Sequence, residues 1–510
     1  MTTRSILGLR LLRGAAWATV GSLISRGSGV AAGLVAAHVL GKELFGQLGV
    51  VMNTVSLLGV MSGFGLSLTA TKFLGEFRRS DPARAGRILA TLFVVSGVGA
   101  TLIGSVFVIT AGRISVALLA GGVPVRTLRI SVLLLVLGAL FGVVSGALVG
   151  LESFGSLATC ALVQATLVIP CTWAFARMAG LDGALSAQIV ASLAGIGVGA
   201  YSLRRACRES GIQPVIHRGC ISELRQVVAF STPQVLATLV TSSAVWASNA
   251  LLANAPGGYA QLGELNVAIQ WRSLVLMLPL MISNVVFPIM NDVFGSGGRQ
   301  ALGNFLRTNL MAIWAVAFPA TVIGICVSPF LVGIYGKSFA TAATATSIML
   351  VAALLDSMGT VWRQVIATLA KMRIVLAASI LWALAVVGCS LAFVNVLGAR
   401  GVAIGQAAGF LVQGIVLALA VKRARIVPPS SDSGTVIPKG AVGVTVNEVL
   451  VTAGFVAVAL ALGRLGLRAH WPFAACLAVG SVAYTCWHLP PSWWKRLRAG
   501  EYAPKVVPQA

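Results

Sequence analysis

Apolar stretches long enough to cross a membrane recur along this sequence from one end to the other. A crossing helix needs about 20 mostly apolar residues to span ~30 Å of hydrocarbon, and its backbone must satisfy its own hydrogen bonds. With 57% hydrophobic and 10% charged residues, the chain is predicted to be an all-α integral membrane protein of about 14 transmembrane helices. The predicted spans are 14–40, 48–70, 88–112, 127–150, 155–176, 183–203, 226–252, 264–290, 304–327, 343–366, 374–396, 401–421, 446–463 and 471–489.

The positive charge of the chain is unevenly distributed between these spans. Most of the 37 Lys and Arg residues fall on one side of the membrane when the N-terminus is placed in the cytoplasm. The positive-inside rule therefore predicts that both termini are cytoplasmic. The net charge of +24 is assigned to loops that contact anionic membrane lipids. No aromatic-basic interleaving indicates a nucleic acid partner.

Two pairs of similar segments recur at the same sequence offset. FGQLG at 45–49 matches YAQLG at 259–263, and ISVALLAGG at 114–122 matches SPFLVGIYG at 328–336. Each pair is predicted to lie on an outside loop, with an even number of spans between equivalent positions. This spacing predicts parallel repeats related by an axis along the membrane normal.

The repeats imply a division of the chain into two lobes around a central cavity, followed by an extra pair of helices. Predicted parts are an N-terminal six-helix lobe (1–204), a C-terminal six-helix lobe (226–421), a cytoplasmic linker (422–445), helices 13 and 14 (446–489) and a cytoplasmic basic tail (490–510).

The sequence shows none of the patterns expected of an enzyme or a metalloprotein. It has no Walker loop, its four histidines do not cluster, and its eight cysteines are scattered without the spacing of a zinc site or a disulfide framework. We therefore expect a transporter without cofactor or metal.

Three arginines lie inside predicted spans: Arg26, Arg272 and Arg363. An arginine cannot lose its charge, and at mid-bilayer it costs at least about 2.5–3.5 kcal/mol. Such a side chain faces a water-filled cavity or a partner, which predicts a cationic cavity for an anionic cargo. The alternatives are pairing with backbone carbonyls for Arg26 and snorkelling to the interface for Arg272 and Arg363.

One acidic residue, Asp356, lies deep in a span. It precedes Arg363 by two helical turns, so both occupy one helix face about 10 Å apart along the axis, and we expect no direct ion pair. Asp356 is predicted to pair with an arginine of another helix or to bind a coupling ion. The alternative is a protonated carboxyl group that is hydrogen-bonded within the bundle.

Neutral polar side chains also recur at depth. Such residues serve either as hydrogen-bonding links between helices or as contacts for sugar hydroxyls. The candidate sugar contacts are Asn53, Gln234, Asn249, Gln270, Gln406 and Gln413.

Four segments carry a resemblance to a known family. They are SRGSGVAAGLVAAHVLGKELFGQLGVVMN (25–53), FSTPQVLATL (230–239), GGYAQLGELNVAIQWRSLVLMLPLMISNVVFPIMN (257–291) and PFLVGIYGKSFATA (329–342). In order and spacing, across about residues 14–421, the chain resembles the polysaccharide-export flippases of the MATE-like superfamily of multidrug, oligosaccharidyl-lipid and polysaccharide exporters.

This resemblance implies a flippase in the bacterial inner membrane that moves polyprenyl-pyrophosphate-linked oligosaccharide by alternating access. Its implied partners are the lipid-linked cargo and the polysaccharide polymerase and export machinery. Arg26 falls on the first-helix arginine of the family and Arg272 on a basic position of helix 8. Where members often carry an acidic residue in helix 7, this chain has Ser248 and Asn249, which leaves Asp356 as the candidate for ion coupling.

Three alternatives stay open at the level of sequence. A multidrug or cation antiporter of the same superfamily predicts an acidic cavity, whereas the deep charges here are mostly basic. A flippase for peptidoglycan lipid precursors would be distinguished by lethality on deletion. A membrane-embedded polysaccharide polymerase or ligase predicts a large outside loop, which the predicted topology lacks.

Overall fold

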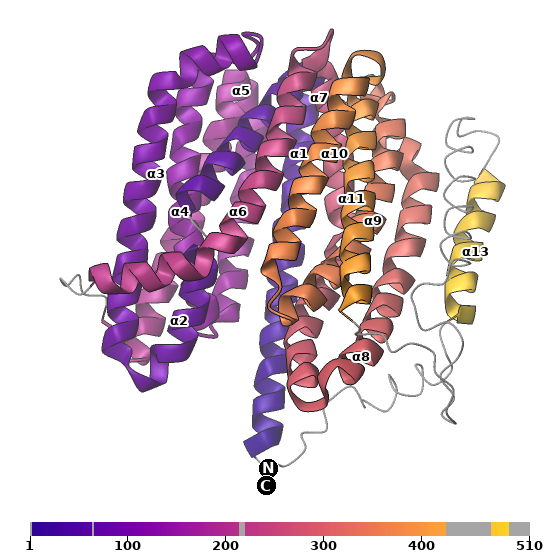
Figure 1. Ribbon diagram of the computed structural model, residues 1–510. Helices are drawn as coiled ribbons and strands as arrows, with labels where there is room; N and C mark the ends of the chain where they lie inside the picture. The colour runs from indigo at the N-terminus through magenta and orange to yellow at the C-terminus, as the bar shows by residue number, and fades with distance from the viewer. Residues whose placement is uncertain (1–2, 64–65, 214–219, 425–470, 489–510) are drawn as a thin grey trace. The chain divides into compact units, whose positions relative to one another are not determined.

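The computed structural model describes residues 3–63, 66–213, 220–424 and 471–488. Within these ranges all regular structure is helical (Figure 1). The elements are α1 (Thr3–Gly63), α2 (Leu66–Ser80), α3 (Pro82–Leu118), α4 (Val125–Gly150), α5 (Phe154–Glu209), α6 (Cys220–Ala253), α7 (Gly258–Val275), α8 (Met277–Gly333), the 3-10 helix η1 (Lys337–Phe339), α9 (Ala342–Thr368), α10 (Met372–Leu397), α11 (Ala399–Arg423) and α13 (Trp471–His488).

Three of the long helices are interrupted by residues with non-helical dihedral angles. The breaks are at Gly41 in α1 (φ 75°), at Ala179 and Gly180 in α5 (φ 56° at the glycine), and at Gly298 in α8 (φ 63°). Glycine adopts such positive φ values without the clash that a Cβ would cause. The α5 break falls between the predicted spans 155–176 and 183–203. The two halves of α5 therefore correspond to these two spans.

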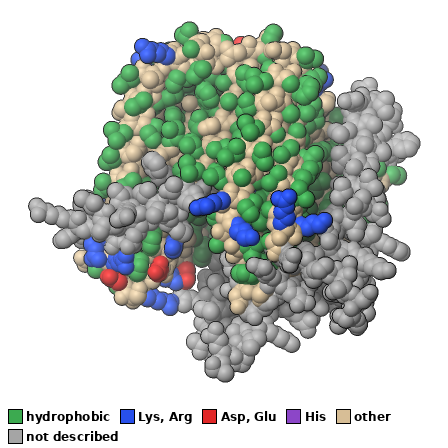
Figure 2. All heavy atoms as spheres, viewed as in Figure 1, with side chains coloured by type: hydrophobic (Ala, Val, Ile, Leu, Met, Phe, Trp, Pro, Cys, Tyr) green, Lys and Arg blue, Asp and Glu red, His purple; other side chains and the backbone are tan. Residues whose placement is uncertain are grey.

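The apolar helices are long enough to cross a membrane many times. In the part of the chain that the structure describes, nine helices meet the length and hydropathy needed, or ten if α7 and the start of α8, bent by 41°, form one broken span. In Figure 2, hydrophobic side chains cover the middle of the face shown, and Lys and Arg side chains lie above and below it. The predicted all-α, multi-pass membrane fold is confirmed. The span 446–463, the segment 425–445 and the tail 490–510 lie outside the described residues, so the count of fourteen stays a prediction.

The segment predicted to lie between the spans 48–70 and 88–112 is helical. Helix α2, an amphipathic helix that mean hydropathy alone does not indicate, occupies Leu66–Ser80, and α3 begins at Pro82. Apolar side chains at three- and four-residue spacing bury one face of α2, as an amphipathic helix requires. Asp81 then caps α3, because its carboxylate accepts a hydrogen bond from the Arg84 amide at 2.9 Å.

The chain divides into two compact units. We call Met1–Gln270, Tyr335–Phe339 and Ala383–Gly405 the first unit, and Trp271–Ile334, Ala340–Trp382 and Gln406–Ala510 the second unit. The lobe boundaries inferred from the repeats stay a prediction.

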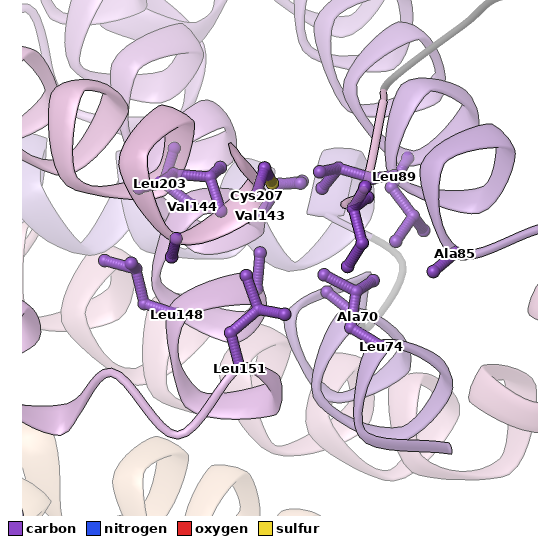
Figure 3. Close-up of a cluster of buried hydrophobic side chains, with 14 of the residues drawn as sticks. Ala70, Leu74, Ala85, Leu89, Val143, Val144, Leu148, Leu151, Leu203 and Cys207 are labelled. Carbon is purple, nitrogen blue, oxygen red and sulfur yellow. The ribbon is translucent and has the colours of Figure 1, made fainter. Parts of the chain in front are cut away.

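The core of the first unit lies where α2, α3, α4 and α5 meet (Figure 3). Leu74, Leu89 and Leu148 are fully enclosed there. Gly146 lets α4 approach the backbone of α2 closely. The Thr71 hydroxyl of α2 donates to the Gly146 carbonyl at 3.0 Å. Helix α2 is therefore packed into the core of the first unit and contributes to its stability.

A second buried cluster joins α8, α9, α10 and α11 in the second unit. Leu306 and Leu310 of α8 pack with Val361 and Val365 of α9. This packing fixes the rotation of α9 about its axis, and therefore the directions in which its polar side chains point.

The repeated segments meet one another in the first unit. Gly46 of α1 lies against the backbone of Tyr259 in α7, and the Tyr259 hydroxyl donates to the Leu119 carbonyl at 2.5 Å. The rings of Phe45 and Phe339 pack edge to face at 6.1 Å. The first pair of motifs was expected on loops, but both copies are helical. Helix α1 resumes directly after the Gly41 break, and α7 begins at Gly258, just before the second copy.

Candidate functional site

Arg272 lies in the last turn of α7, at the bend between α7 and α8. Pro279 follows in the first turn of α8, where a missing backbone N–H breaks no helical hydrogen bond. Since α7 begins at Gly258, Arg272 is about 20 Å along the helix, deeper than the predicted span start placed it. Its side chain is 15% exposed.

Asp356, on α9, bridges two arginines. Its Oδ2 accepts from Nη2 of Arg272 at 2.8 Å, and its Oδ1 accepts from Nη2 of Arg363 at 2.8 Å. Asp356 therefore pairs with an arginine of another helix, as expected. The expectation that Arg363 is too distant is wrong, because a helical side chain points back toward the N-terminus and arginine is long enough to cover two turns.

Arg363 is held by further polar groups around it. Its Nη1 donates to Gln413 Oε1 of α11 at 2.7 Å, and its Nη2 donates to the Thr360 hydroxyl at 2.5 Å. The Thr360 hydroxyl itself donates to the Asp356 carbonyl at 2.9 Å. Side chains of α9 and α11 thus fix the position of one guanidinium group, which is pre-organised for recognition.

The Arg272 guanidinium also contacts an aromatic face. Its Cζ lies 4.8 Å from the centre of the Phe410 ring, and that ring packs on Trp382 at 5.3 Å. Among the residues that the structure describes, the buried Nε of Arg272 has no hydrogen-bond partner. An unsatisfied donor on a buried cation is costly, so a rearrangement that gave this N–H an acceptor would stabilise the site.

We call Arg272, Asp356 and Arg363 the arginine–aspartate cluster. Two guanidinium groups face one carboxylate, so the cluster has a net charge of +1. The three side chains are only 15 to 27% exposed, and water screens charges weakly in such a place. The cluster is therefore a partly accessible site with excess positive charge.

Asn53, one predicted sugar contact, lines a small pocket in the first unit. With Ser56 of α1 and Thr241 and Ser242 of α6, it encloses about 170 Å³, and Leu57 and Val245 complete the wall. Beside it the Trp246 indole donates to the Thr54 hydroxyl at 3.0 Å. Hydroxyl and amide groups both donate and accept hydrogen bonds, as binding to a sugar requires.

None of the other predicted residues is among the described residues that line this pocket. Arg26 lies on α1 in the first unit with intermediate exposure. Gln270 accepts from the Tyr335 hydroxyl at 2.7 Å; burial raises the pKa of Tyr335, which keeps it a donor. Asn249 and Gln406 are buried. Gln234 lies on α6, and its side chain is not among those that the structure describes.

Several residues at these sites were missed by sequence reasoning. Thr241, Ser242, Thr360 and Phe410 belong to ordinary-looking apolar helices, and nothing in their spacing distinguishes them. Their contribution follows from helix rotation and neighbours, which single-sequence periodicity does not supply.

Solved structures of MATE transporters share this fold. A multidrug resistance MATE family transporter of the MOP superfamily in an inward-facing conformation matches with a TM-score of 0.66 at 18% identity, covering 79% of this chain and 94% of that one. The eukaryotic MATE transporter AtDTX14 matches at 0.63 and 14% identity, covering 82% and 99%. A MOP superfamily transporter from Pyrococcus furiosus, described as having a binding pocket of reverse polarity, matches at 0.59 and 17% identity, covering 82% and 95%. The chain has the fold of a MATE-type membrane transporter.

The sequence itself defines the family more narrowly. The family model for polysaccharide biosynthesis proteins matches residues 11–294, more than half of the chain. This chain belongs to the polysaccharide biosynthesis protein family, as its four motifs indicated. No curated protein matches it in sequence.

Proposed function

We propose that this protein is a flippase that moves a polyprenyl-pyrophosphate-linked oligosaccharide across the bacterial inner membrane for surface polysaccharide export. The observation that carries the proposal is the net positive arginine–aspartate cluster, buried in a transporter fold of a polysaccharide biosynthesis family. No covalent bond is made or broken in this role.

In this mechanism Asp356 holds the two arginines in place when no cargo is bound. Its two oxygens each engage one guanidinium group, which prevents the two cations from separating. An arriving pyrophosphate replaces the carboxylate on one or both arginines, and forms charge-assisted hydrogen bonds in the geometry that guanidinium groups favour. Departure of the cargo restores the carboxylate contacts.

The same cluster separates this proposal from cation export. A drug or metal cation would meet net positive charge at Arg272 and Arg363, which costs binding energy in a poorly screened site. For the Pyrococcus furiosus transporter, the reverse polarity of the binding pocket suggests a different function. We apply the same reasoning to this chain.

The glycan part of the cargo needs neutral polar contacts as well. The pocket at Asn53, Ser56, Thr241 and Ser242 supplies amide and hydroxyl groups without charge, which suits sugar hydroxyls. The polyprenyl tail stays in the hydrocarbon, where transfer to water would cost about 0.8 kcal/mol per methylene group.

The test is transport in vesicles that contain the purified protein and a fluorescently tagged polyprenyl-pyrophosphate oligosaccharide. Dithionite added outside bleaches the cargo as it reaches the outer leaflet. We expect Arg272→Ala to slow transport by at least about 30-fold, because breaking a buried charge contact costs about 2 kcal/mol or more. Arg272→Lys keeps the charge but loses the planar guanidinium group that binds an anion through two N–H groups, so an intermediate rate is expected.

The matched control is Arg373→Ala. Arg373 is an exposed arginine near the start of α10 in the same unit, and its removal should leave the rate unchanged. Wild-type transport by Arg272→Ala would contradict the proposal. So would transport of a cationic dye in place of the glycan, and a peptidoglycan precursor moved in preference to an export oligosaccharide would favour the closest alternative.

A further inference from the structure

A groove of about 620 Å³ lies between α1 and α5 in the first unit. This volume is in the range of about 300–1,000 Å³ that is usual for small-molecule sites. The wall combines apolar and polar groups. The lining residues are Leu34, Val35, His38, Val39, Trp173, Ala176 and Arg177.

The groove is placed by the way the two helices pack. Gly21 of α1 lies against Ala158 of α5, Ala32 packs with Val168, and His38 shares the groove with Arg177. The difference in residue number between the contacting residues is nearly the same in all three pairs, so the two helices run parallel. Since His38 and Arg177 each come just before the break in their helix, the groove lies at the same end of both half-helices.

The polar side chains of the groove are positively charged or hydrogen-bonding, and no carboxylate is among its described lining residues. The Arg177 guanidinium lies 4.2 Å from the centre of the Trp173 ring, which orders it. Within the described part of the chain its N–H groups have no hydrogen-bond partner, so they can bind a carboxylate. Nδ1 of His38 lies 3.0 Å from the Leu34 carbonyl, so Nε2 is the nitrogen that is left for a ligand.

The nearest acidic residue along α5 is already engaged elsewhere. Asp182 accepts a hydrogen bond from the Thr127 hydroxyl at 2.6 Å and lies 3.5 Å from Arg126. It therefore does not neutralise Arg177, and the groove keeps its positive charge.

The exposed stripe that leads to the groove changes character along α5. It holds Thr159, Leu162, Thr166 and Pro170, and it ends with Trp173 and Arg177 at the groove. A tryptophan beside an arginine near the end of an apolar helix is typical of the membrane–water interface. Water-soluble sugars can reach that level of the membrane.

We propose that this groove binds an acidic sugar of the cargo, with its carboxylate on Arg177 and its ring in the space beside Trp173 and His38. The inference rests on the proposed function. The groove is much larger than a phosphate group needs, which favours a charged sugar over the pyrophosphate of the carrier. The groove would then make the protein selective for glycans that contain uronic acids.

The experiment compares two cargoes on the same polyprenyl-pyrophosphate carrier, one with a neutral oligosaccharide and one in which a glucuronate replaces a hexose. Arg177→Gln should slow the acidic cargo by about tenfold or more, the usual effect of losing a hydrogen bond to a charged group. The neutral cargo should change less than about twofold. His38→Gln is a second variant with the same expected direction.

Arg113→Gln is the matched control. Arg113 is an exposed arginine near the end of α3 in the same unit, outside the groove, and both cargoes should move at wild-type rates. A binding arm uses free tetraglucuronate and purified protein in calorimetry, where Arg177→Gln should weaken binding by a similar factor.

The outcomes separate the two proposals. The acidic-sugar site would be overturned if Arg177→Gln slowed both cargoes equally, or if Arg177→Gln and Arg113→Gln had equal effects. Transport of the neutral cargo by the wild-type protein would still support the flippase in either case. If free tetraglucuronate does not bind, the site is also refuted. If wild-type protein moves neither cargo, the flippase proposal itself fails.

Discussion

Asp356→Asn is the sharpest test of how the arginine–aspartate cluster is held together. The variant keeps the shape of the side chain but removes the only charge that separates Arg272 from Arg363 in the cluster. Two guanidinium groups on opposite oxygens of one carboxylate lie roughly 6 Å apart, and at an effective dielectric constant of about 20 they repel by about 3 kcal/mol. Breaking a buried ion pair from one side costs about 3–5 kcal/mol.

Partial exposure of the cluster, 15 to 27%, places the expected loss at the lower end, about 3 kcal/mol. The apparent melting temperature of the purified protein should therefore fall by about 5 °C or more. Pyrophosphate should reverse the loss, because at about 100 times its dissociation constant a ligand returns about 2.7 kcal/mol. The wild-type protein should gain less, since the anion must first displace the carboxylate.

The control is Asp182→Asn in the first unit. Asp182 lies 3.5 Å from Arg126, whose side chain is 82% exposed, and exposed pairs contribute about 1 kcal/mol or less. Its melting temperature should change little and should not respond to pyrophosphate differently from wild type. An Asp356→Asn protein as stable as wild type, or an equal pyrophosphate shift in both proteins, would refute the reasoning.

Three further predictions concern the rest of the molecule. In a deletion strain at matched protein levels, Arg26→Ala should abolish glycan export and Arg26→Lys should keep part of it; full export with alanine would refute a charge role. A Cβ at Gly46 would meet the Tyr259 carbonyl, so Gly46→Ala should lower the apparent melting temperature, whereas Gly138→Ala, with nothing within 4 Å, should leave it equal or higher. A membrane-impermeant thiol reagent should label Ser80→Cys only from the cytoplasm and Arg126→Cys only from outside, in a background without native cysteines; labelling from the opposite sides would invert the topology.

For the part of the chain that the structure describes, the order of the long apolar helices could be read from the sequence, because hydrocarbon thickness sets the length of an apolar run. The shortest predicted gaps, at 151–154, 177–182 and 397–400, coincide with a turn, a break at Gly180 and a turn at Gly398. The helix α2 was missed because its amphipathic pattern resembles a charged loop when only mean hydropathy is considered.

The composition of the candidate site was predicted only in part. The cost of burying charge identifies Arg272, Asp356 and Arg363 without a structure. Their mutual contacts depend on the rotation of α7, α9 and α11 and on the reach of an arginine side chain, which spacing along one helix does not give. The groove at His38 and Arg177 was missed for a related reason, since His38 is at the end of one predicted span and Arg177 falls in the gap between two others, and nothing in the sequence places the two side by side.

The contact between Tyr259 and Leu119 determines which substitutions the neighbouring positions tolerate. The tyrosine hydroxyl binds a main-chain carbonyl, so any apolar residue that fits at 119 would present the same acceptor. Gly122 has no such freedom, because a Cβ there would strike the Tyr259 ring. Random replacement at the two sites should therefore leave a broad set of survivors at 119 and almost none at 122.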